Sequence, residues 1–353
     1  MNASRIAFDG VWKRYGESVA VRDLSMTIEP GSLTTLLGPS GCGKTTTLRM
    51  IAGLETASQG RIRIGSRDVT DESAADRNVS MVFQNYALFP HMSVLDNVAY
   101  GLIVARQRKT VAHEKAMQAL SLVKLGELAA RFPSELSGGQ QQRVAIARAL
   151  VLEPEVLLFD EPLSNLDTRL RRAMRDEIRD LQRRLGLTVV YVTHDQSEAL
   201  AISDRVIVMK QGRIIQAGDP QELYHRPRDA FVASFMGECN ILDAELLDTD
   251  GQLARLSLGG LQFQVPHRGA VPGKVQVSLR PEGVRVSEHL NGGLVATVKN
   301  VSYLGGTSEI TIDTGMGDWF AVQTGSATRL TPGQTVDVGI EPHCVALLSD
   351  QEP

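Results

Sequence analysis

A glycine-rich segment near the N-terminus has the residues of a phosphate-binding loop. It reads Gly38-Pro39-Ser40-Gly41-Cys42-Gly43-Lys44-Thr45-Thr46. Glycines let the backbone curl until its N–H groups point inward, and those groups bind phosphate together with the positive end of the helix that follows. Lys44 supplies a point charge for the β- and γ-phosphates, and the hydroxyl of Thr45 is a ligand for Mg²⁺. The segment therefore predicts a site for a nucleotide and Mg²⁺.

A second group of polar residues follows two apolar runs. Residues 156–159 form a continuous apolar run, typical of a parallel strand buried on both faces, and Asp160 and Glu161 come directly after it. Carboxylates at this end of a strand lie where α/β sheets bind ligands. We expect Asp160 to complete the Mg²⁺ site and Glu161 to polarise an attacking water molecule. Residues 188–193 form a similar run that ends in His194, which we expect to reach the γ-phosphate.

Two further side chains are candidates for the same site. Gln84 follows the short strand pattern of residues 80–83 and is expected to contact Mg²⁺ or the attacking water, although an amide that caps loop backbone gives the same pattern. Tyr15 lies in a segment of alternating apolar and polar residues, and we assign it to stacking on adenine. We assign Trp12, in the same segment, to core packing.

A second helix start suited to phosphate occurs later in the chain. It reads Leu136-Ser137-Gly138-Gly139-Gln140. The serine is a helix cap and the glycines leave backbone N–H groups open, but the segment has no lysine of its own. Since one chain offers two different helix ends of this kind, the simplest use is that a second copy brings its Ser137 end to the open side of the nucleotide. The sequence thus predicts a homodimer.

Length and composition limit the classes of protein to which this chain can belong. The 353 residues suit two domains, and 42% apolar with 22% charged residues is the balance of a soluble globular protein. No apolar run approaches the ~18 residues that cross a bilayer, and residues 1–10 have no apolar signal core, so we expect a cytoplasmic protein. Cys42, Cys239 and Cys344 are odd in number and far apart, which argues against a disulfide framework and a zinc site.

The pattern along the chain predicts an α/β core with two additions. Residues 6–29 alternate as strands do, residues 60–69 have the pattern of another strand pair, and residues 88–155, approximately, have the amphipathic pattern of a helical insertion. An arginine-rich helix over residues 168–184 has acidic residues interspersed, which indicates a charged surface rather than a nucleic-acid patch.

The C-terminal part of the chain differs in composition and charge. Beyond Gly237, short strand patterns punctuated by glycine and proline indicate a small β-barrel. Residues 237–353 contain seven Lys/Arg and fourteen Asp/Glu, a net charge of −7, so this barrel is expected to be a poor polyanion binder. We predict a nucleotide-binding domain over residues 1–236, a regulatory or ligand-sensing barrel over residues 237–353, and no nucleic-acid partner.

Together these motifs resemble the ATP-binding subunits of bacterial ABC importers that carry a C-terminal TOBE-type regulatory domain. After the phosphate loop come the glutamine loop around Gln84, the signature that starts at Leu136 and the carboxylate motif that ends at Glu161, in that family's order. Asp167 ends the segment that matches the D-loop, and His194 matches the switch histidine. The likeness covers essentially the whole chain.

The resemblance implies a fold and a set of site residues. The fold is α/β, a P-loop NTPase core of the ABC ATPase type with an antiparallel β subdomain and a helical insertion, followed by a small all-β, OB-like TOBE barrel. The residues that it assigns to catalysis are Lys44, Gln84, Glu161 and His194. Those that it assigns to Mg²⁺ are Thr45, Gln84 and Asp160. Those that it assigns to ATP are Tyr15, Gly38, Ser40, Gly41, Cys42, Gly43, Lys44, Thr45, Thr46, Ser137, Gly138, Gly139, Gln140 and Asp167.

The resemblance also implies partners. Two copies would clamp two ATP molecules head to tail, and hydrolysis would drive a membrane permease from the cytoplasmic face of the bacterial inner membrane. A periplasmic or lipoprotein substrate-binding protein would be an indirect partner. The alternative is a soluble ABC ATPase that acts on DNA or ribosomes, but such proteins usually carry tandem cassettes or a long coiled-coil insertion, and this chain has one cassette and a modest insertion.

The transported substrate is not encoded in these motifs. Importers of this group carry polyamines, ferric iron, sulfate or phosphonate, or sugars. Two short segments of the second domain favour the polyamine or ferric iron importers. They are Gly237-Glu238-Cys239-Asn240 and Leu279-Arg280-Pro281-Glu282.

Overall fold

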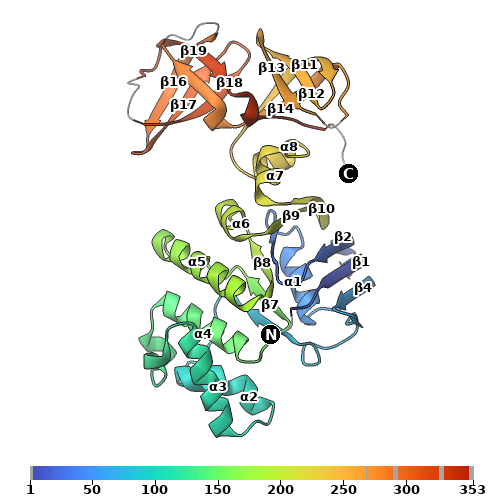
Figure 1. The fold of residues 1–353 in the computed structure, drawn as a ribbon, viewed down its shortest axis with the longest axis vertical. Helices are drawn as coiled ribbons and strands as arrows, with labels where there is room; N and C mark the ends of the chain where they lie inside the picture. Colours follow the sequence, from blue (N-terminus) through green and yellow to red (C-terminus); the bar gives the residue numbers. More distant parts are fainter. Residues whose placement is uncertain (1–2, 268, 289–292, 326–329, 350–353) are drawn as a thin grey trace. The chain divides into compact units, whose positions relative to one another are not determined.

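The computed structural model describes residues 3–267, 269–288, 293–325 and 330–349 (Figure 1). The chain divides into two compact units, the first ending at Pro220 and the second beginning at Gln221. Within the described ranges, no helix combines the length and the apolar character that a membrane span requires.

A six-stranded sheet forms the centre of the first unit. Its strands, in sheet order, are β10 (Arg213–Gly218), β9 (Arg205–Lys210), β3 (Leu33–Leu37), β8 (Thr188–Thr193), β7 (Val156–Asp160) and β6 (Val79–Val82). The five strands from β9 to β6 are parallel, and every residue of β3 and β8 is buried. This confirms the parallel core that the continuous apolar runs predict. β6 ends at Val82, so Gln84 lies in the loop after it.

The central sheet is covered on both faces. Leu157 and Val189 belong to one hydrophobic cluster, whereas the next residues along the same strands, Leu158 and Val190, belong to another. Side chains alternate between the faces of a sheet, so the two clusters are its two faces. The first cluster includes residues of α5 (Thr168–Leu185), and the second includes residues of α1 (Lys44–Ala52).

The antiparallel subdomain and the helical insertion are both confirmed. The subdomain is a four-stranded sheet with the order β2 (Ser18–Ile28), β1 (Ile6–Tyr15), β4 (Gln59–Ile64) and β5 (Arg67–Asp68). The insertion consists of α2 (Val94–Val104), α3 (Lys109–Leu122), the short 3₁₀ turns η1 (Gly126–Leu128) and η2 (Pro133–Glu135), and α4 (Gly138–Leu150). α4 begins at Gly138, directly after Ser137, which caps it.

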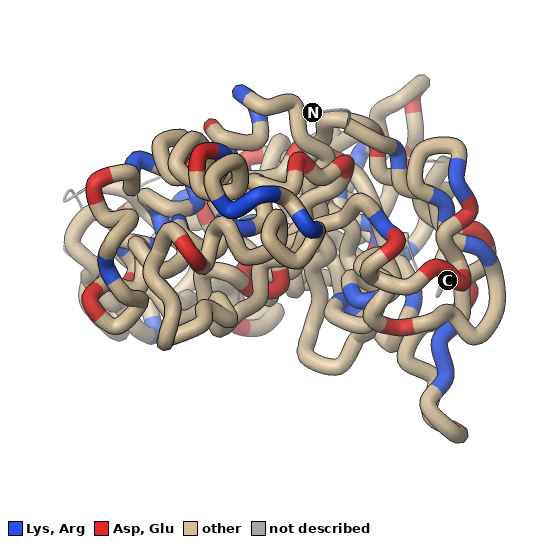
Figure 2. Tube along the Cα trace, turned by 90° about the horizontal axis from the view of Figure 1, so that it is seen from below, with Lys and Arg blue, Asp and Glu red and all other residues tan. Residues whose placement is uncertain are grey.

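The arginine-rich helix α5 is a charged surface element, as the sequence predicts. Arg179 forms an ion pair with Asp204, and Arg171 lies 3.3 Å from Asp195 at the start of α6 (Gln196–Ile202). Figure 2 shows basic and acidic residues interspersed along the trace.

The second unit contains the expected all-β domain. It has two five-stranded antiparallel sheets around one hydrophobic core. The first sheet, in order, is β13 (Leu261–Pro266), β12 (Leu253–Leu258), β11 (Asn240–Asp250), β14 (Gly273–Leu279) and β20 (Val345–Leu347). The second, in order, is β15 (Val284–Ser287), β19 (Thr335–Ile340), β16 (Leu294–Tyr303), β17 (Thr307–Asp313) and β18 (Asp318–Thr324). The sequence pattern does not predict β11, β12 and β15.

Two helices precede these sheets and lie in the same unit. They are α7 (Pro220–His225) and α8 (Ala230–Phe235), which the sequence analysis assigned to the nucleotide-binding domain. The Arg280 side chain, which is 2% exposed, holds both helices against the sheets of this unit. Its guanidinium lies 4.0 Å from the ring centroid of Tyr224 and donates to the carbonyl oxygens of Tyr224 (2.7 Å), Ala233 (2.9 Å) and Gly237 (3.1 Å). One buried cation therefore attaches both helices to β14.

Replacing this cation should loosen the second unit. Arg280→Met keeps a similar length but leaves several buried carbonyl oxygens without a donor, so we expect a loss of about 3 kcal/mol in the free energy of unfolding of this unit. Calorimetry of the full chain should show the corresponding transition at a lower temperature, and limited proteolysis should cut between residues 221 and 238. Arg255→Gln, which breaks an exposed pair with Asp248, is the control and should change little. Equal stability of the two variants would contradict the role of Arg280.

Candidate functional site

The glycine-rich segment lies between a strand and a helix, as predicted. β3 ends at Leu37 and α1 starts at Lys44. Gly43 has φ 103°, which favours glycine, and a β-carbon there would lie 2.6 Å from the carbonyl oxygen of Ala20. A β-carbon on Gly38 would lie 2.3 Å from the carbonyl oxygen of Met209. The loop therefore keeps its curled form only with glycine at these two positions.

Lys44 is held inside the loop. Its Nζ donates to the carbonyl oxygens of Gly38 (2.6 Å) and Pro39 (3.0 Å) and lies 3.8 Å from the sulfur of Cys42, and the side chain is buried. Burial raises the pKa of the Cys42 thiol, so this sulfur is a poor nucleophile. The loop thus presents one cation, surrounded by its own backbone.

Thr45 and Asp160 lie side by side next to the loop. The Thr45 hydroxyl donates to Asp160 Oδ1 at 3.2 Å. Burial, the largest cause, raises the pKa of Asp160, and the nearby carboxylate of Glu161 acts in the same direction, whereas the hydrogen bond from Thr45 lowers it. A hydroxyl beside a half-buried carboxylate is the oxygen donor set that Mg²⁺ prefers.

Glu161 and His194 meet at the same edge of the sheet. Glu161 follows β7 with φ 45°, a left-handed conformation that is uncommon outside glycine, and its N–H donates to the carbonyl oxygen of Val192 (3.0 Å). His194 Nδ1 lies 3.1 Å from Glu161 Oε2. A carboxylate only accepts, so the ring donates from Nδ1, and its other nitrogen, Nε2, is left for a second partner. The expected pair is therefore brought together.

Gln84 reaches this pair only through intermediates. Its Nε2 donates to Ser164 Oγ (3.1 Å), and Ser164 Oγ donates to the carbonyl oxygen of Glu161 (3.0 Å). Asn165 Nδ2 donates back to the carbonyl oxygen of Gln84 (3.1 Å). No hydrogen bond in the described part of the chain joins Gln84 to Thr45. Ser164 and Asn165 were not predicted to hold Gln84, because nothing in the sequence pattern shows that these loops meet.

The signature segment packs against the D-loop. Ser137 Oγ accepts from the N–H of Gln140 (3.4 Å), while Gln140 Oε1 accepts from the N–H of Ser137 (2.9 Å). The two side chains therefore cap the start of their own helix, α4. A β-carbon on Gly139 would lie 3.0 Å from Leu170 in the first turn of α5, the helix that Asp167 caps. Among the described residues no hydrogen bond links Ser137 to the phosphate loop.

Tyr15 lies beside the phosphate loop with its ring partly exposed. It is the last residue of β1, it is 46% exposed, and Glu55 and Thr46 of the phosphate loop are near enough to its hydroxyl to shift its pKa, which burial raises. Trp12 is half-buried, and the guanidinium of Arg14 lies 5.2 Å from the centroid of its ring.

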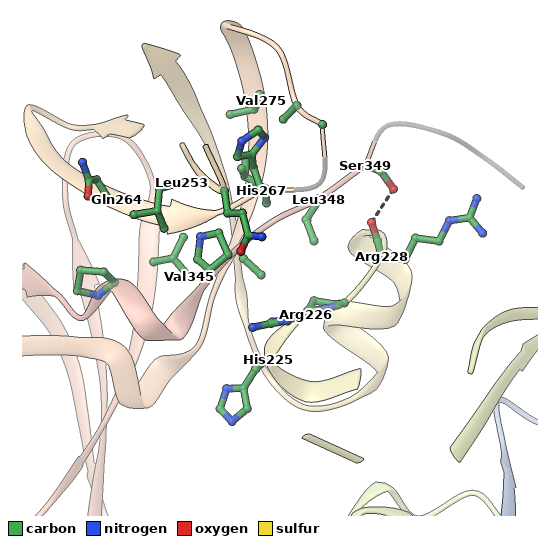
Figure 3. A pocket seen from close by; sticks show the side chains of 18 of the residues that line it. His225, Arg226, Arg228, Leu253, Gln264, His267, Val275, Val345, Leu348 and Ser349 are labelled. Carbon is green, nitrogen blue, oxygen red and sulfur yellow. Dashed lines mark hydrogen bonds between the residues drawn. The ribbon is translucent and has the colours of Figure 1, made fainter. Parts of the chain in front are cut away.

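The second unit has a cavity of about 1290 Å³ (Figure 3). His225, His267 and His343 are among its lining residues, which include no carboxylate. Figure 3 shows Ser349 at its margin, where the hydroxyl donates to the carbonyl oxygen of Arg228. No residue of the phosphate loop lines the cavity, so it is not part of the site built around Lys44.

One further cluster has metal-ligand chemistry. Glu341, His343 and Cys344 place ligand atoms within 4.8 Å of one another. Glu341 is already paired with Arg285, and burial, with nearby carboxylates, raises the pKa of the Cys344 thiol to about 11. A cation would have to compete with a guanidinium and deprotonate this thiol, so the cluster is a poor metal site.

Comparisons with known proteins agree with this geometry. Residues 21–164 match the ABC transporter family and residues 277–348 match the TOBE domain. The chain is 53% identical over 344 residues to the "Fe(3+) ions import ATP-binding protein FbpC" of Rhizobium etli, with 98% of each chain covered. It is 54% identical over 336 residues to the protein of the same name from Brucella abortus, with 95% of each covered. The chain belongs to the ABC transporter family.

Solved structures of ABC ATPases share the fold of the first unit. A nucleotide-free ATP-binding cassette from an ABC transporter is 28% identical, with a TM-score of 0.56 over 61% of this chain and 91% of that one. A dimeric cassette in a post-hydrolysis state, bound to ADP and Pi, is 31% identical, with a TM-score of 0.54 over 61% of this chain and 98% of that one. The chain is therefore an ABC ATPase, and this family works on ATP with Mg²⁺.

The partial burial of the Asp160 carboxylate predicts that the free energy of unfolding depends on pH. Because its folded-state pKa is raised, the stability that this group contributes is full below its unfolded pKa, near 4, and is lost as pH rises through the folded pKa. Asp160→Asn should therefore raise the melting temperature of the nucleotide-free, Mg²⁺-free protein by a few degrees at pH 7. The gain should shrink as the pH falls toward 4.

The control for this prediction is an exposed carboxylate on the same unit. Asp176 pairs with Arg175 at the surface of α5, so Asp176→Asn should leave the melting temperature nearly unchanged at either pH. A fall in melting temperature on Asp160→Asn at pH 7 would contradict our reading of this carboxylate.

Proposed function

We propose that this ABC ATPase hydrolyses MgATP in a head-to-tail homodimer and thereby drives the import of ferric iron through a membrane permease. The observation that carries the hydrolytic part is the pairing of Glu161 with His194 at the edge of the sheet where the phosphate loop also begins, since β3, β7 and β8 run parallel and end there. The relatives that are 53–54% identical over nearly the whole chain are named as Fe(3+) import ATP-binding proteins, which supports ferric iron as the substrate.

Binding of the triphosphate starts from the phosphate loop. The backbone N–H groups after Gly38 and the N-terminus of α1 favour an anion, and Lys44 would exchange its two carbonyl partners for phosphate oxygens. Thr45 and Asp160 would hold Mg²⁺, which when bound offsets the charge of the phosphates. Gln84, which the sequence analysis also assigned to Mg²⁺, would reach the site after a change in its hydrogen bond to Ser164.

Hydrolysis then depends on the pair at the sheet edge. Glu161 orients a water molecule toward the γ-phosphorus, a new P–O bond forms, and ADP leaves with the electrons of the broken bond. His194 gives its Nδ1–H to Glu161 and would carry a second proton on Nε2 to donate to a γ-phosphate oxygen, which only accepts, so one ring connects the water-binding carboxylate to the transferred phosphate.

A second copy completes each site. Gly138 and Gly139 in the first turn of α4 have N–H groups without a partner inside the helix, but among the described residues neither they nor Ser137 hydrogen-bond to the phosphate loop. In a head-to-tail pair, each signature faces the partner's nucleotide. The dimeric cassette with ADP and Pi among the structural neighbours supports this arrangement.

The permease is the expected membrane partner. Three apolar side chains on α2 are exposed, namely Tyr100 (39%), Ile103 (39%) and Val104 (63%). The Tyr100 ring lies 4.7 Å from that of Phe89, which follows the glutamine loop, so a partner docked here would touch the segment that contains Gln84. We place the protein at the cytoplasmic face of the membrane, with a substrate-binding protein as an indirect partner.

Exchanging Glu161 for glutamine tests the hydrolytic assignment. Glu161→Gln keeps the shape of the side chain but removes the charge that polarises water, so ATP turnover should fall by about 10²- to 10³-fold while ATP binding persists. Light scattering in the presence of MgATP should show a stable dimer. Glu153→Gln, at an exposed site on the insertion, is the control. Normal turnover by Glu161→Gln would remove this residue from the mechanism.

Uptake assays test the substrate and the partner. In a strain that lacks the gene, wild-type protein should restore ferric iron uptake and Lys44→Ala should not, while polyamine uptake stays unchanged in both. The wild-type protein should sediment with membranes only when its permease is present. Restored polyamine uptake would overturn the iron substrate, and recovery on ribosomes or DNA would favour the soluble ATPase alternative.

A further inference from the structure

The ring of Tyr15 is held on several sides in the first unit. The ammonium of Lys13 lies 4.8 Å from the ring centroid. The same ammonium lies 2.8 Å from Glu55 Oε2 and donates to the carbonyl oxygen of Thr56 at 2.8 Å. Glu55 and Thr46 lie near the Tyr15 hydroxyl, where Glu55 acts with burial to raise its pKa. Lys13, Glu55 and Tyr15 therefore form a closed set of contacts, which we call the tyrosine clamp.

The clamp is ordered rather than solvated. The side chain of Lys13 is only 12% exposed and that of Glu55 24%, although both carry charge and both lie in surface segments. The hydrogen bond from Lys13 is the largest cause that lowers the pKa of Glu55, so the carboxylate stays ionised at neutral pH and accepts from this ammonium. Isolated surface pairs rarely bury themselves in this way, because fixing two long side chains costs conformational entropy.

The backbone around the clamp is fixed by other contacts. The N–H of Ser58 donates to the carbonyl oxygen of Trp12 (2.7 Å), and the Ser58 hydroxyl accepts from the N–H of Arg14 (3.0 Å). These bonds attach the segment after α1 to β1. The clamp side chains are thus not needed to keep the two segments together, and their burial calls for another explanation.

We propose that Lys13 and Glu55 are positioning residues for the base of the nucleotide, which they serve by holding the Tyr15 ring in one orientation beside the phosphate loop. The proposal rests on the proposed function, because it takes Tyr15 as the residue that stacks on adenine. The ammonium of Lys13 covers one side of the ring and leaves the exposed side for the base. A ring already fixed loses little entropy on binding, and a cation over its face is attracted to the π-electrons and steadies it.

The inference predicts a loss that affects only ligands with a base. Lys13→Met keeps the aliphatic stem and removes the charge, and Glu55→Ala removes the carboxylate that pairs with Lys13 beside Tyr15. Both should weaken ATP binding about three- to tenfold, measured by calorimetry on the full chain without Mg²⁺ so that hydrolysis does not contribute. Binding of inorganic tripolyphosphate, which lacks the base, should stay within about twofold of the wild type. Lys13→Arg should keep most of the ATP affinity.

The controls separate positioning from a structural role. Lys115→Met breaks an exposed Lys–Glu pair with Glu153, remote in sequence from the clamp, and should change the binding of neither ligand. Equal weakening of ATP and tripolyphosphate by Lys13→Met would show that the clamp only supports the phosphate loop, and unchanged ATP binding in both clamp variants would show that it does nothing for the base. Either result overturns the inference.

A third variant separates this inference from the proposed function. Tyr15→Leu should abolish the preference for ATP over tripolyphosphate. If it does so while Lys13→Met and Glu55→Ala keep that preference, the stacking role of Tyr15 stands and only the clamp is wrong. If Tyr15→Leu also keeps the preference, the assignment of Tyr15 to the base fails, and the clamp fails with it.

Discussion

The parallel register of three neighbouring strands decides where chemistry can occur in this chain. Leu37 at the end of β3 is aligned with Thr193 at the end of β8, and Asp160 at the end of β7 is aligned with Val192. The next residues along the chain are Gly38, His194 and Glu161. Gly38 precedes Glu161 and His194 by more than a hundred residues, yet all three lie at one edge of the sheet. A shift of register would separate them. The buried, two-faced packing of these strands holds that register.

A second constraint governs the signature. Gly138 and Gly139 lack β-carbons, so the first turn of α4 approaches Leu166 and Leu170 closely. Farther along the same two helices, Arg143 on α4 donates through Nε to Glu177 on α5 at 2.8 Å. A close glycine contact and an ion pair thus fix the direction of α4 relative to α5. The signature is therefore held in a fixed position on its own chain. Among the described residues, however, no hydrogen bond links its Ser137 to the phosphate loop of that chain.

The sequence predicts the site better than it predicts the second unit. The phosphate loop, the carboxylates after β7 and the histidine after β8 were predictable because continuous apolar runs mark buried parallel strands and polar residues mark where they end. β11 was missed because more than half of its residues are polar or acidic, which hides buried positions such as Leu246. The contact of Gln84 with Ser164 and the tyrosine clamp were also missed, since loop meetings of this kind leave no periodic pattern.

The site contains several groups that are costly for the folded chain alone. Lys44 is buried with two carbonyl oxygens and the Cys42 sulfur, all neutral, as its hydrogen-bond partners in the loop, burial raises the pKa of Asp160, and Glu161 occupies a left-handed backbone conformation. Phosphate oxygens would give Lys44 a charged partner, and a divalent cation would stabilise the ionised form of Asp160. Nucleotide binding would therefore remove part of the unfavourable free energy that these groups contribute to the folded, nucleotide-free chain. The packing of β3, β7 and β8 on both faces of the sheet has to supply the stability that keeps these groups in place until the nucleotide binds.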